Sequence, residues 1–390
     1  MSLTAAGAEG NNPAIEANTP ARPSLHTASP GRRVEVSAYG ENPLDTLNQH
    51  LRVVAQPVPD PDQLDPGDVV ITVRRAAVGW VDLLMMSGQY QHMVRPPYTP
   101  GLEYSGEVSW VGSDVEDLSV GDAVMVDGLM AGPRSLGAYQ RWGGFASYAV
   151  APQGAVHRLP AGWGLEEGCC FFGNYETAWH CLFARGKLSA GETVLIHGAS
   201  GSTGLAAVHL AKLAGARVIA TGRSPEKLAL VKAQGADHTL CTADEPRFRD
   251  AVKALTGGAG VDVVYDGVGG PISLESLRCV RFGARFLIVG WAATPLVARG
   301  RGKRGAPNAN VLPTNLIMMK GVDVLGCPTA ISTHRDPSIR STRLSALLKQ
   351  AHAGQLKPHF GPVYAFDDLK AALEAKWHSR HVGGCLLSLD

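Results

Sequence analysis

The chain has 390 residues, of which 45% are hydrophobic and 18% are charged, and its formal net charge is +1. This length exceeds one typical hydrophobic core, so we expect a soluble globular protein of two domains. The balanced charge gives no general attraction to nucleic acid or to a membrane surface. The longest apolar run, 286–298, is too short to span a bilayer and contains Pro295.

The cysteines and the N-terminal composition predict a cytoplasmic location. The seven cysteines are scattered and form no Cys-x-x-Cys pair, which is typical of small buried hydrophobes in a reducing compartment rather than of a disulfide framework. Residues 1–31 are rich in Ala, Asn, Pro, Ser and Gly and lack periodicity, so we predict a disordered tail and no secretory signal. The cysteines are Cys169, Cys170, Cys181, Cys241, Cys279, Cys327 and Cys385.

The first half of the chain predicts a small, mostly β domain, which we place at residues 32–165. Short β-branched segments alternate with turn residues about every 8–12 positions, as in a barrel-like domain. One short helix is expected at 79–88, where Gly88 ends it. The predicted strands are 33–39, 51–58, 68–78, 105–111, 121–126 and 143–150.

The second half alternates strands and helices, which predicts a doubly wound parallel sheet, the Rossmann form of α/β fold, over residues 166–325. Helices at 165–170 and 175–184 lead into it. The predicted strands are 193–197, 217–221, 239–241, 261–265, 285–289 and 320–326, and the helices are 205–214, 225–234, 248–255 and 273–280. Residues 326–390 add helices at 342–353 and 366–379 and a closing strand at 382–387, which we expect to return to the first domain.

The strand at 193–197 is followed at once by a glycine-rich turn and a helix. This order is that of a dinucleotide site, because small side chains let the backbone approach the pyrophosphate and free helix N–H groups meet its charge. Alanine takes the first position of the Gly-x-Gly-x-x-Gly spacing. The alternative is a turn that serves only close packing of strand on helix. The predicted pyrophosphate residues are Ala199, Ser200, Gly201, Ser202, Thr203 and Gly204.

The end of the second strand indicates which dinucleotide is bound. An NAD site has a carboxylate there, but this chain has Gly222, Arg223 and Ser224, followed by Lys227. Guanidinium, hydroxyl and ammonium groups all donate hydrogen bonds to a 2′-phosphate, which favours NADPH. The alternative is that these cations belong to a solvated helix start.

Several motifs occur in a fixed order along most of the chain after residue 33. They are Pro100-Gly-Leu-Glu103, Val120-Gly-Asp-Ala-Val124, Gly144-Phe-Ala-Ser-Tyr-Ala149, Arg223-Ser-Pro-Glu-Lys-Leu228 and Asp266-Gly-Val-Gly269. Together they resemble the medium-chain dehydrogenase/reductase superfamily, and within it the zinc-independent quinone oxidoreductase and enoyl reductase branch. The resemblance implies a GroES-like catalytic domain beside the Rossmann domain, and a homodimer.

The departures from this family concern zinc. Its zinc-dependent members carry a cysteine ligand and a Gly-His-Glu motif, but the matching positions here are Gly79 and Leu102, and only Glu103 remains. Tetrahedral zinc needs three or four protein ligands, so we predict no metal. Without a Lewis acid, the resemblance implies hydride transfer from NADPH to a quinone or a carbonyl-conjugated alkene rather than alcohol oxidation. The alternatives are an enoyl-thioester reductase and a non-catalytic, crystallin-like or redox-sensing NADPH-binding protein.

Three residues around the short helix are candidates for the reaction itself. Tyr90 lies in Ser87-Gly-Gln-Tyr90, which resembles the Gly-x-Tyr of enoyl-thioester reductases, so it is a candidate proton donor, with substrate stacking or a structural role as alternatives. Asp82 is a candidate for orienting the cofactor side, although a supporting role suits it better. Trp80 either stacks on a flat acceptor or fills the core.

The resemblance adds further cofactor contacts. Thr177 matches a threonine near the nicotinamide, and Asn315 matches an asparagine near the ribose. Val268, Gly290 and Trp291 follow strands at the carboxyl edge of the expected sheet, where ligands bind in this fold.

A basic segment, 299–304, follows these residues and includes Arg301 and Lys303. A solvated loop is the simplest interpretation. The alternatives are a clamp for an acidic substrate, such as the phosphates of a CoA thioester, and a lid over the cofactor.

Overall fold

The computed structural model describes residues 25, 28–243, 247–295, 298–299, 303–304 and 310–390. Most of the predicted tail, 1–31, lies outside the described residues. Two residues of this segment are ordered, in contrast to the prediction of a disordered tail. Gly31 opens the first strand, and Leu25 is only 4% exposed because it packs on Val70 and Val150 of the β domain.

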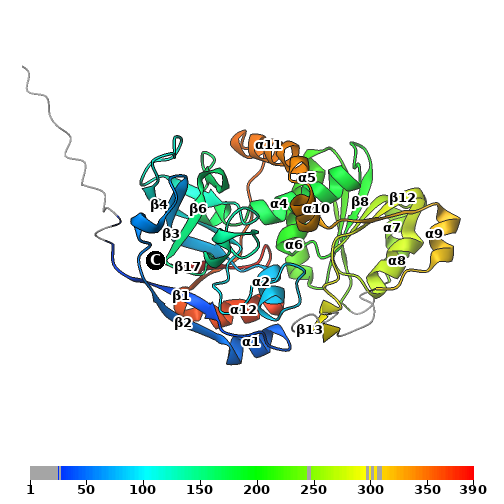
Figure 1. Cartoon of the computed structure of the whole chain (residues 1–390). Coiled ribbons are helices and arrows are strands. Elements are labelled where there is room, and N and C mark those ends of the chain that lie inside the picture. The colour runs from blue at the N-terminus through cyan, green and yellow to red at the C-terminus, as the bar shows by residue number, and fades with distance from the viewer. Residues whose placement is uncertain (1–24, 26–27, 244–246, 296–297, 300–302, 305–309) are drawn as a thin grey trace, which may run out of the picture.

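The first domain is built on a seven-stranded sheet, which lies on the left of Figure 1. Its strand order is β16-β17-β3-β4-β5-β7, and β6 pairs with the other part of β3. A separate antiparallel pair, β1 and β2, lies beside it. The strands are β1 (Gly31–Val36), β2 (Leu51–Gln56), β3 (Asp68–Ala77), β4 (Glu103–Val111), β5 (Ala123–Val126), β6 (Tyr148–Pro152) and β7 (Val156–Arg158).

Three short helices belong to this half: α1 (Pro43–Gln49), α2 (Trp80–Met86) and α3 (Leu165–Gly168). Helix α1 was not predicted, although Asn42 caps it by accepting a hydrogen bond from the Asp45 N–H. The strand predicted at 143–150 is wrong in its first part. Gly143 and Gly144 instead form a loop in close contact with other backbone, since a Cβ on Gly143 would lie 2.1 Å from the Thr99 carbonyl oxygen.

The second domain has the predicted doubly wound sheet, with six parallel strands in the order β10-β9-β8-β11-β12-β15, on the right of Figure 1. Its strands are β8 (Thr193–Ile196), β9 (Arg217–Gly222), β10 (His238–Cys241), β11 (Val261–Asp266), β12 (Val280–Ile288) and β15 (Asp323–Gly326). Its helices are α4 (Phe172–Trp179), a π-helical turn (His180–Arg185), α5 (Ser202–Leu213), α6 (Pro225–Ala233), α7 (Arg249–Leu255), α8 (Pro271–Cys279) and α9 (Thr314–Lys320).

Two predicted boundaries in this domain are corrected. Helix α5 begins at Ser202, three residues before the predicted start at Leu205, because the turn residue Gly201 is already its N-cap. Lys320 ends helix α9 instead of opening a strand, because Gly321 adopts a left-handed conformation with φ 58° that closes the helix.

The last segment returns to the first domain. Strand β17 (Leu386–Ser388) pairs antiparallel with β3 and parallel with β16 (Val363–Ala365). It is shorter than the predicted strand at 382–387 because Gly383 and Gly384 have φ of 70° and 86°, outside the extended region. The helices of this segment are α10 (Thr329–Arg335), α11 (Ser338–His352) and α12 (Leu369–Trp377), and α10 was not predicted.

Buried charges join α11 to both domains. The Arg340 side chain is 9% exposed, and its Nε donates to Glu176 on α4 over 2.8 Å while a terminal nitrogen pairs with Asp127 after β5. Arg343, also on α11, lies 3.6 Å from the same Glu176 carboxylate. These ions are shielded from solvent, so each depends on its partners for stabilisation.

Six of the seven cysteines are buried, as expected of small hydrophobes, but Cys241 is exposed at the end of the edge strand β10. Within the described ranges, no helix has both the length and the apolar content needed to cross a membrane.

Replacing Arg340 with alanine should lower the free energy of unfolding by about 3–5 kcal/mol, because Asp127 and Glu176 would stay buried without their shared cation. Urea titration monitored by circular dichroism measures this change. Arg335→Ala, at the exposed last residue of α10, is the matched control and should change stability by less than about 0.5 kcal/mol. A loss below about 1 kcal/mol in Arg340→Ala would contradict the role given to this network.

Candidate cofactor and substrate site

The loop between β8 and α5 has the form that a dinucleotide pyrophosphate requires. Gly198 has φ of 64°, and the chain then enters α5 at Gly201. Gly204 must lack a side chain, since a Cβ there would lie 2.3 Å from the Gly198 carbonyl oxygen. Ala199 is fully buried and its N–H donates to Thr221 of β9, so this position faces the sheet and accommodates a methyl group. The open N-terminus of α5 is left facing the carboxyl edge of the sheet.

The C-terminal segment is bonded directly to this loop. The Gly383 N–H donates to the Ser200 carbonyl over 3.0 Å, and Ser202 Oγ donates to the Gly383 carbonyl over 2.9 Å. The Lys376 ammonium on α12 donates to Ser202 Oγ over 3.1 Å. A Cβ on Gly384 would lie 2.9 Å from that ammonium, so glycine leaves the space that Lys376 fills. A cation therefore lies at the N-terminus of α5, and no local sequence signal predicts it.

Glu103 connects the loop to the first domain. Its carboxylate accepts hydrogen bonds from the Gly173 N–H over 2.6 Å and from Asn174 Nδ2 over 3.3 Å. Asn174 in turn accepts from the Thr203 hydroxyl over 3.1 Å. Burial raises the pKa of Glu103, against a lowering by the charge of Arg134. Thr177 lies one turn further along α4 and is half-buried.

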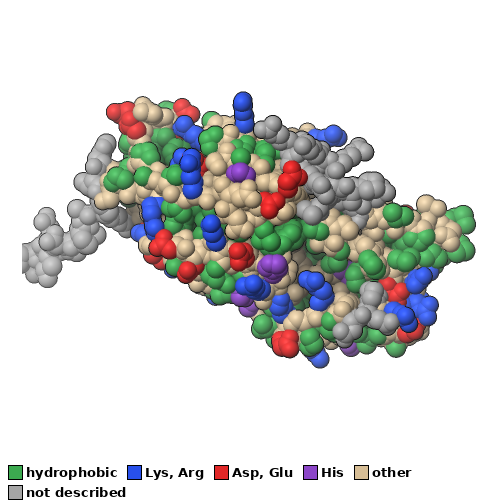
Figure 2. Space-filling view, turned by 90° about the horizontal axis from the view of Figure 1, so that it is seen from below, with side chains coloured by type: hydrophobic (Ala, Val, Ile, Leu, Met, Phe, Trp, Pro, Cys, Tyr) green, Lys and Arg blue, Asp and Glu red, His purple; other side chains and the backbone are tan. Residues whose placement is uncertain are grey.

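Cations gather at the end of β9, where a 2′-phosphate is expected. Ser224 caps α6 by accepting the Lys227 N–H, and the Lys227 ammonium donates to the carbonyl of Ser379. Burial, and then the nearby charge of Arg223, lower the pKa of Lys227. Burial, followed by the charges of Lys227 and Arg380, lowers the pKa of His381. Figure 2 shows Lys and Arg side chains together with histidine near the middle of the face seen from below.

The sequence therefore located Gly222, Arg223, Ser224 and Lys227 beside one another, but it missed Arg380 and His381. Gly222 is half-buried, and Arg223 is exposed. The two missed residues come from the C-terminal segment, and His381 Nε2 lies 2.9 Å from the Tyr364 hydroxyl.

The residues that follow β11 and β12 meet the loop at the carboxyl edge. A Cβ on Gly198 would lie 3.2 Å from the Val268 side chain. The Gly290 N–H donates to the Asp266 carbonyl over 3.2 Å, and Trp291 follows with 43% of its surface exposed. The structure thus brings these three predicted cofactor residues together with the glycine-rich turn.

Asn315 does not join this group by any hydrogen bond among the described residues. It is exposed on the first turn of α9. Asn310 is closer to the site, because its Nδ2 donates to Ser273 Oγ over 2.6 Å and lies 3.9 Å from the Cβ position of Gly269. Asn310 is therefore a better candidate for a ribose contact than the residue chosen by resemblance.

Asp82 is a buried carboxylate whose hydrogen bonds are to backbone N–H groups. It is 2% exposed, and its two oxygens accept hydrogen bonds from the N–H groups of Gly79 and Gly101, each over 3.0 Å. These bonds fix the start of α2 and the loop before β4. Burial raises the pKa of Asp82 to about 7, although both hydrogen bonds favour the charged form.

Trp80 and Tyr90 lie at opposite ends of α2. The Trp80 ring stacks on Trp377 of α12, with centroids 5.2 Å apart and planes 7° from parallel, so one of its faces is already covered. Tyr90 is half-buried and forms an edge contact with His92, whose centroid lies 6.0 Å away. This arrangement leaves Tyr90 available for the proton-donor role, and Trp80 is chiefly a packing residue.

Most of the basic segment, for which a clamp or lid was among the predicted roles, lies outside the described residues. Arg301 lies outside the described residues. Lys303 belongs to β14 (Lys303–Arg304), whose backbone pairs with β13 (Ala298–Arg299), and the side chain of Lys303 is also outside the description.

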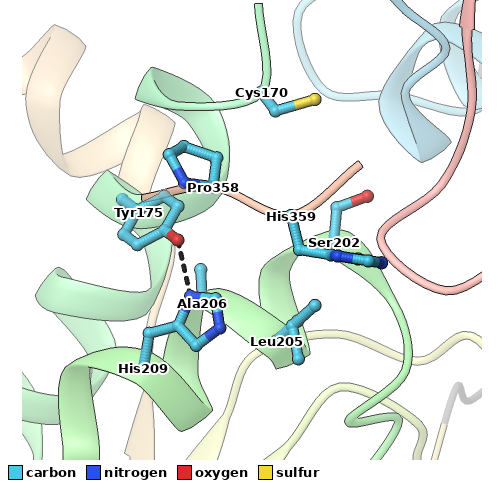
Figure 3. Close-up of a pocket in the computed structure, with 8 residues that line it drawn as sticks. All are labelled: Cys170, Tyr175, Ser202, Leu205, Ala206, His209, Pro358 and His359. Carbon is cyan, nitrogen blue, oxygen red and sulfur yellow. Dashed lines mark hydrogen bonds between the residues drawn. The ribbon is translucent and has the colours of Figure 1, made fainter. Parts of the chain in front are cut away.

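A small cavity of about 10 Å³, roughly the space of one water molecule, lies beside the loop, behind the first turn of α5 (Figure 3). The Tyr175 hydroxyl and His209 Nδ1 lie 2.7 Å apart across it, and His209 Nε2 continues to Gln234 over 3.0 Å. The lining residues are Cys170, Tyr175, Ser202, Leu205, Ala206, His209, Pro358 and His359. Among the described residues, no group of three or more His, Cys, Asp or Glu side chains is arranged to hold a metal ion.

Two family models match the chain. The alcohol dehydrogenase GroES-like domain matches residues 65–161, and the zinc-binding dehydrogenase domain matches residues 202–335. The first model covers most of the β domain, and the second covers most of the parallel sheet.

Curated relatives and solved structures cover nearly the whole chain. Quinone oxidoreductase-like protein 2 of Mus musculus is 31% identical over 330 residues, which are 84% of this chain and 87% of the relative. Quinone oxidoreductase of Sus scrofa is 31% identical over 336 residues, 86% and 92% of the two chains. A mycobacterial protein solved in complex with NADPH is 27% identical, with a TM-score of 0.73 over 92% of this chain and 99% of that one.

The raised pKa of Asp82 predicts a specific pH dependence of stability. Its pKa is about 7 in the folded protein and near 3.8 when unfolded, so its stabilising contribution is complete below pH 3.8 and is lost as the pH rises through 7. Between pH 5 and 8 the unfolding free energy of the wild type should therefore fall by about 2–3 kcal/mol more than that of Asp82→Asn.

Denaturant titrations of both proteins across this pH range measure the difference. Asp82→Asn is less stable at low pH because its amide nitrogen accepts no hydrogen bond, but only the pH slope tests the titration. Parallel slopes for the two proteins would show that Asp82 does not titrate in this range.

Proposed function

The chain belongs to the medium-chain dehydrogenase/reductase superfamily, in its quinone oxidoreductase branch, and we propose that it is a zinc-independent, NADPH-dependent reductase of quinones or carbonyl-conjugated alkenes. Membership makes it an oxidoreductase by family. The finer statements, namely NADPH as the cofactor and the class of acceptor, rest on the residues described above.

The cation cluster at the end of β9 is the observation that carries this proposal. Arg223 and Lys227 stand where an NAD site has a carboxylate, and Arg380 adds a further charge from the C-terminal segment. A 2′-phosphate carries a charge and acceptor oxygens that pair with these donors, whereas the neutral 2′-hydroxyl of NADH gains little from them. The NADPH complex of a structurally similar mycobacterial protein agrees with this choice.

The rest of the loop supports a bound pyrophosphate. The N–H groups at the start of α5 are free to donate, and the Lys376 ammonium lies beside them on Ser202. Since Lys376 is held by a hydroxyl and not by a carboxylate, its charge stays available to a phosphate oxygen. NADPH would supply the hydride; the protein binds and orients it.

The protein's own contribution to the reaction is to supply a proton to the acceptor. Hydride addition to a conjugated alkene or a quinone places negative charge on the carbonyl oxygen, and a proton must follow. We assign proton donation to the Tyr90 hydroxyl, which lies past the end of α2 on the side away from the Trp80–Trp377 stack. Asp82 and Glu103 hold the backbone around this region and take no part in the transfer.

Cofactor preference is tested by removing the cations. Arg223→Ala and Lys227→Ala should each lower kcat/KM for NADPH by about 10-fold or more, since each loses a charge-assisted hydrogen bond to the 2′-phosphate. The same variants should change kcat/KM for NADH by less than about 3-fold, which makes NADH the internal control. Wild-type protein that uses NADH as well as NADPH would refute the NADPH assignment.

Tyr90→Phe should lower kcat for an enone such as 3-penten-2-one by about 10-fold or more and reduce the solvent isotope effect, because the variant has no hydroxyl proton to give. Binding of NADPH, followed by its fluorescence, should be unchanged. Phe replacement of Tyr148, whose hydroxyl donates to the Ser29 carbonyl in the β domain, is the matched control. Full turnover by Tyr90→Phe would remove Tyr90 from the proton-donor role.

A further inference from the structure

Arg134 is a buried cation without a fixed partner. It lies in the loop between β5 and β6, with 8% of its surface exposed, and its Nε has no hydrogen-bond partner among the described residues. No carboxylate in the described part of the chain lies within ion-pair distance of its guanidinium. A buried charge left in this way costs free energy unless a ligand supplies the opposite charge.

Two histidines lie near this cation, and one ring nitrogen of each has no hydrogen-bond partner among the described groups. The His92 and His334 rings meet edge to face with centroids 4.6 Å apart, and the Nε2 atom of each is buried without a hydrogen-bond partner among described groups. His334 is hydrogen-bonded to the backbone of Arg134. Burial lowers the pKa of both histidines, and the charge of Arg134 contributes to this lowering. They are therefore neutral at neutral pH, and the guanidinium is the charged member of the cluster.

The two buried acids nearest to Arg134 form hydrogen bonds with other groups. Asp82 and Glu103 feel the charge of Arg134, which lowers the pKa of each against the larger effect of burial. Both oxygens of Asp82, however, accept hydrogen bonds from backbone N–H groups, and the Glu103 carboxylate accepts hydrogen bonds from Gly173 and Asn174. Neither carboxylate is within ion-pair distance of the guanidinium, so no acid in the described part of the chain neutralises its charge.

The cluster adjoins the residue to which we assign proton transfer. His92 lies between His334 and Tyr90, with the Tyr90 centroid 6.0 Å from the His92 centroid. The backbone that Asp82 fixes at Gly101 leads directly into β4 and Glu103, which holds the start of α4 beside the nucleotide loop. An anion on Arg134 would thus belong to the same molecule that Tyr90 protonates.

We propose that Arg134, with His92 and His334, binds a carboxylate of the hydride acceptor, so that the preferred substrates are conjugated enones that also carry a carboxylate. This inference rests on the proposed function. A guanidinium recognises a carboxylate through paired hydrogen bonds, and the histidine Nε2 atoms provide further polar contacts. In the reaction, hydride from NADPH bonds to one alkene carbon and a proton to the other; the carboxylate is unchanged, and NADP⁺ and the saturated keto acid leave.

The test compares trans-4-oxo-2-pentenoate with its methyl ester, which share the enone but differ in charge. Replacing Arg134 with methionine should lower kcat/KM for the acid by at least about 30-fold, the cost of leaving one buried charge unpaired, and for the ester by less than about 3-fold. Because each acceptor is compared between proteins, the difference in their intrinsic reactivity cancels. Arg134→Lys should retain part of the preference, since it keeps the charge but loses the paired geometry.

Arg141→Met is the matched control. This arginine lies in the same loop but is exposed over the Trp142 ring, so its loss should leave both acceptors unaffected. Equal losses for acid and ester in Arg134→Met would overturn the carboxylate site and give Arg134 a structural role or one toward the carbonyl oxygen. Thermal unfolding of each variant with NADPH present shows whether it is folded.

A binding measurement separates this inference from the proposed function. The saturated 4-oxopentanoate should raise the unfolding temperature of the wild-type NADP⁺ complex, and neither its methyl ester nor Arg134→Met should show the effect. If the wild type reduces neither enone but binds 4-oxopentanoate through Arg134, the proposed reaction fails while the anion site stands. If it reduces the ester and ignores both carboxylates, the reaction stands and the anion site is refuted.

Discussion

The hydrogen bonds between Gly383 and the loop residues Ser200 and Ser202 determine how the two domains meet. They join the segment before the last strand, which is paired into the β domain, to the turn that begins the first helix of the parallel sheet. Because this segment follows α12, the same contact carries Lys376 to the start of α5 and Arg380 and His381 to the end of β9. The nucleotide site is therefore completed by the C-terminal segment, which adds Lys376 to the loop and Arg380 and His381 to the cations at the end of β9.

Local sequence was sufficient for the parts of the site that are built within one strand–turn–helix unit. The glycine-rich turn and the exchange of a carboxylate for Arg223 and Lys227 are readable from adjacent residues, whereas the zinc-ligand positions Gly79 and Leu102 were identified only through the family resemblance. The missed residues depend on contacts across long stretches of chain: Ser202 and Gly383 are 181 positions apart. Asn315 shows the limit of resemblance, because the family position is exposed here while Asn310 reaches the site. Helices α1, α9 and α10, each seven residues long, were not predicted, because two turns give only a weak periodic signal.

Burial explains why chemically similar residues have different roles. Asp127 and Glu176 are charged and buried around Arg340, and they stabilise the contact of α11 with both domains. Asp82 is equally buried but bonds only to backbone; burial raises its pKa to about 7 against these hydrogen bonds, and it serves to fix a loop. Arg134 is buried and has no acidic partner in the described chain. Because a buried unpaired charge costs free energy, we infer that a ligand supplies the opposite charge.

The close contact between Gly384 and Lys376 also constrains how this protein can evolve. Any side chain at position 384 would collide with the ammonium and with Ser202, each 2.9 Å from the Cβ position. A substitution there would have to displace the ammonium or the Ser202 hydroxyl, and a φ of 86° at position 384 disfavours any side chain. The two positions are thus coupled in evolution: a lysine at 376 keeps its place at the start of α5 as long as glycine is kept at 384.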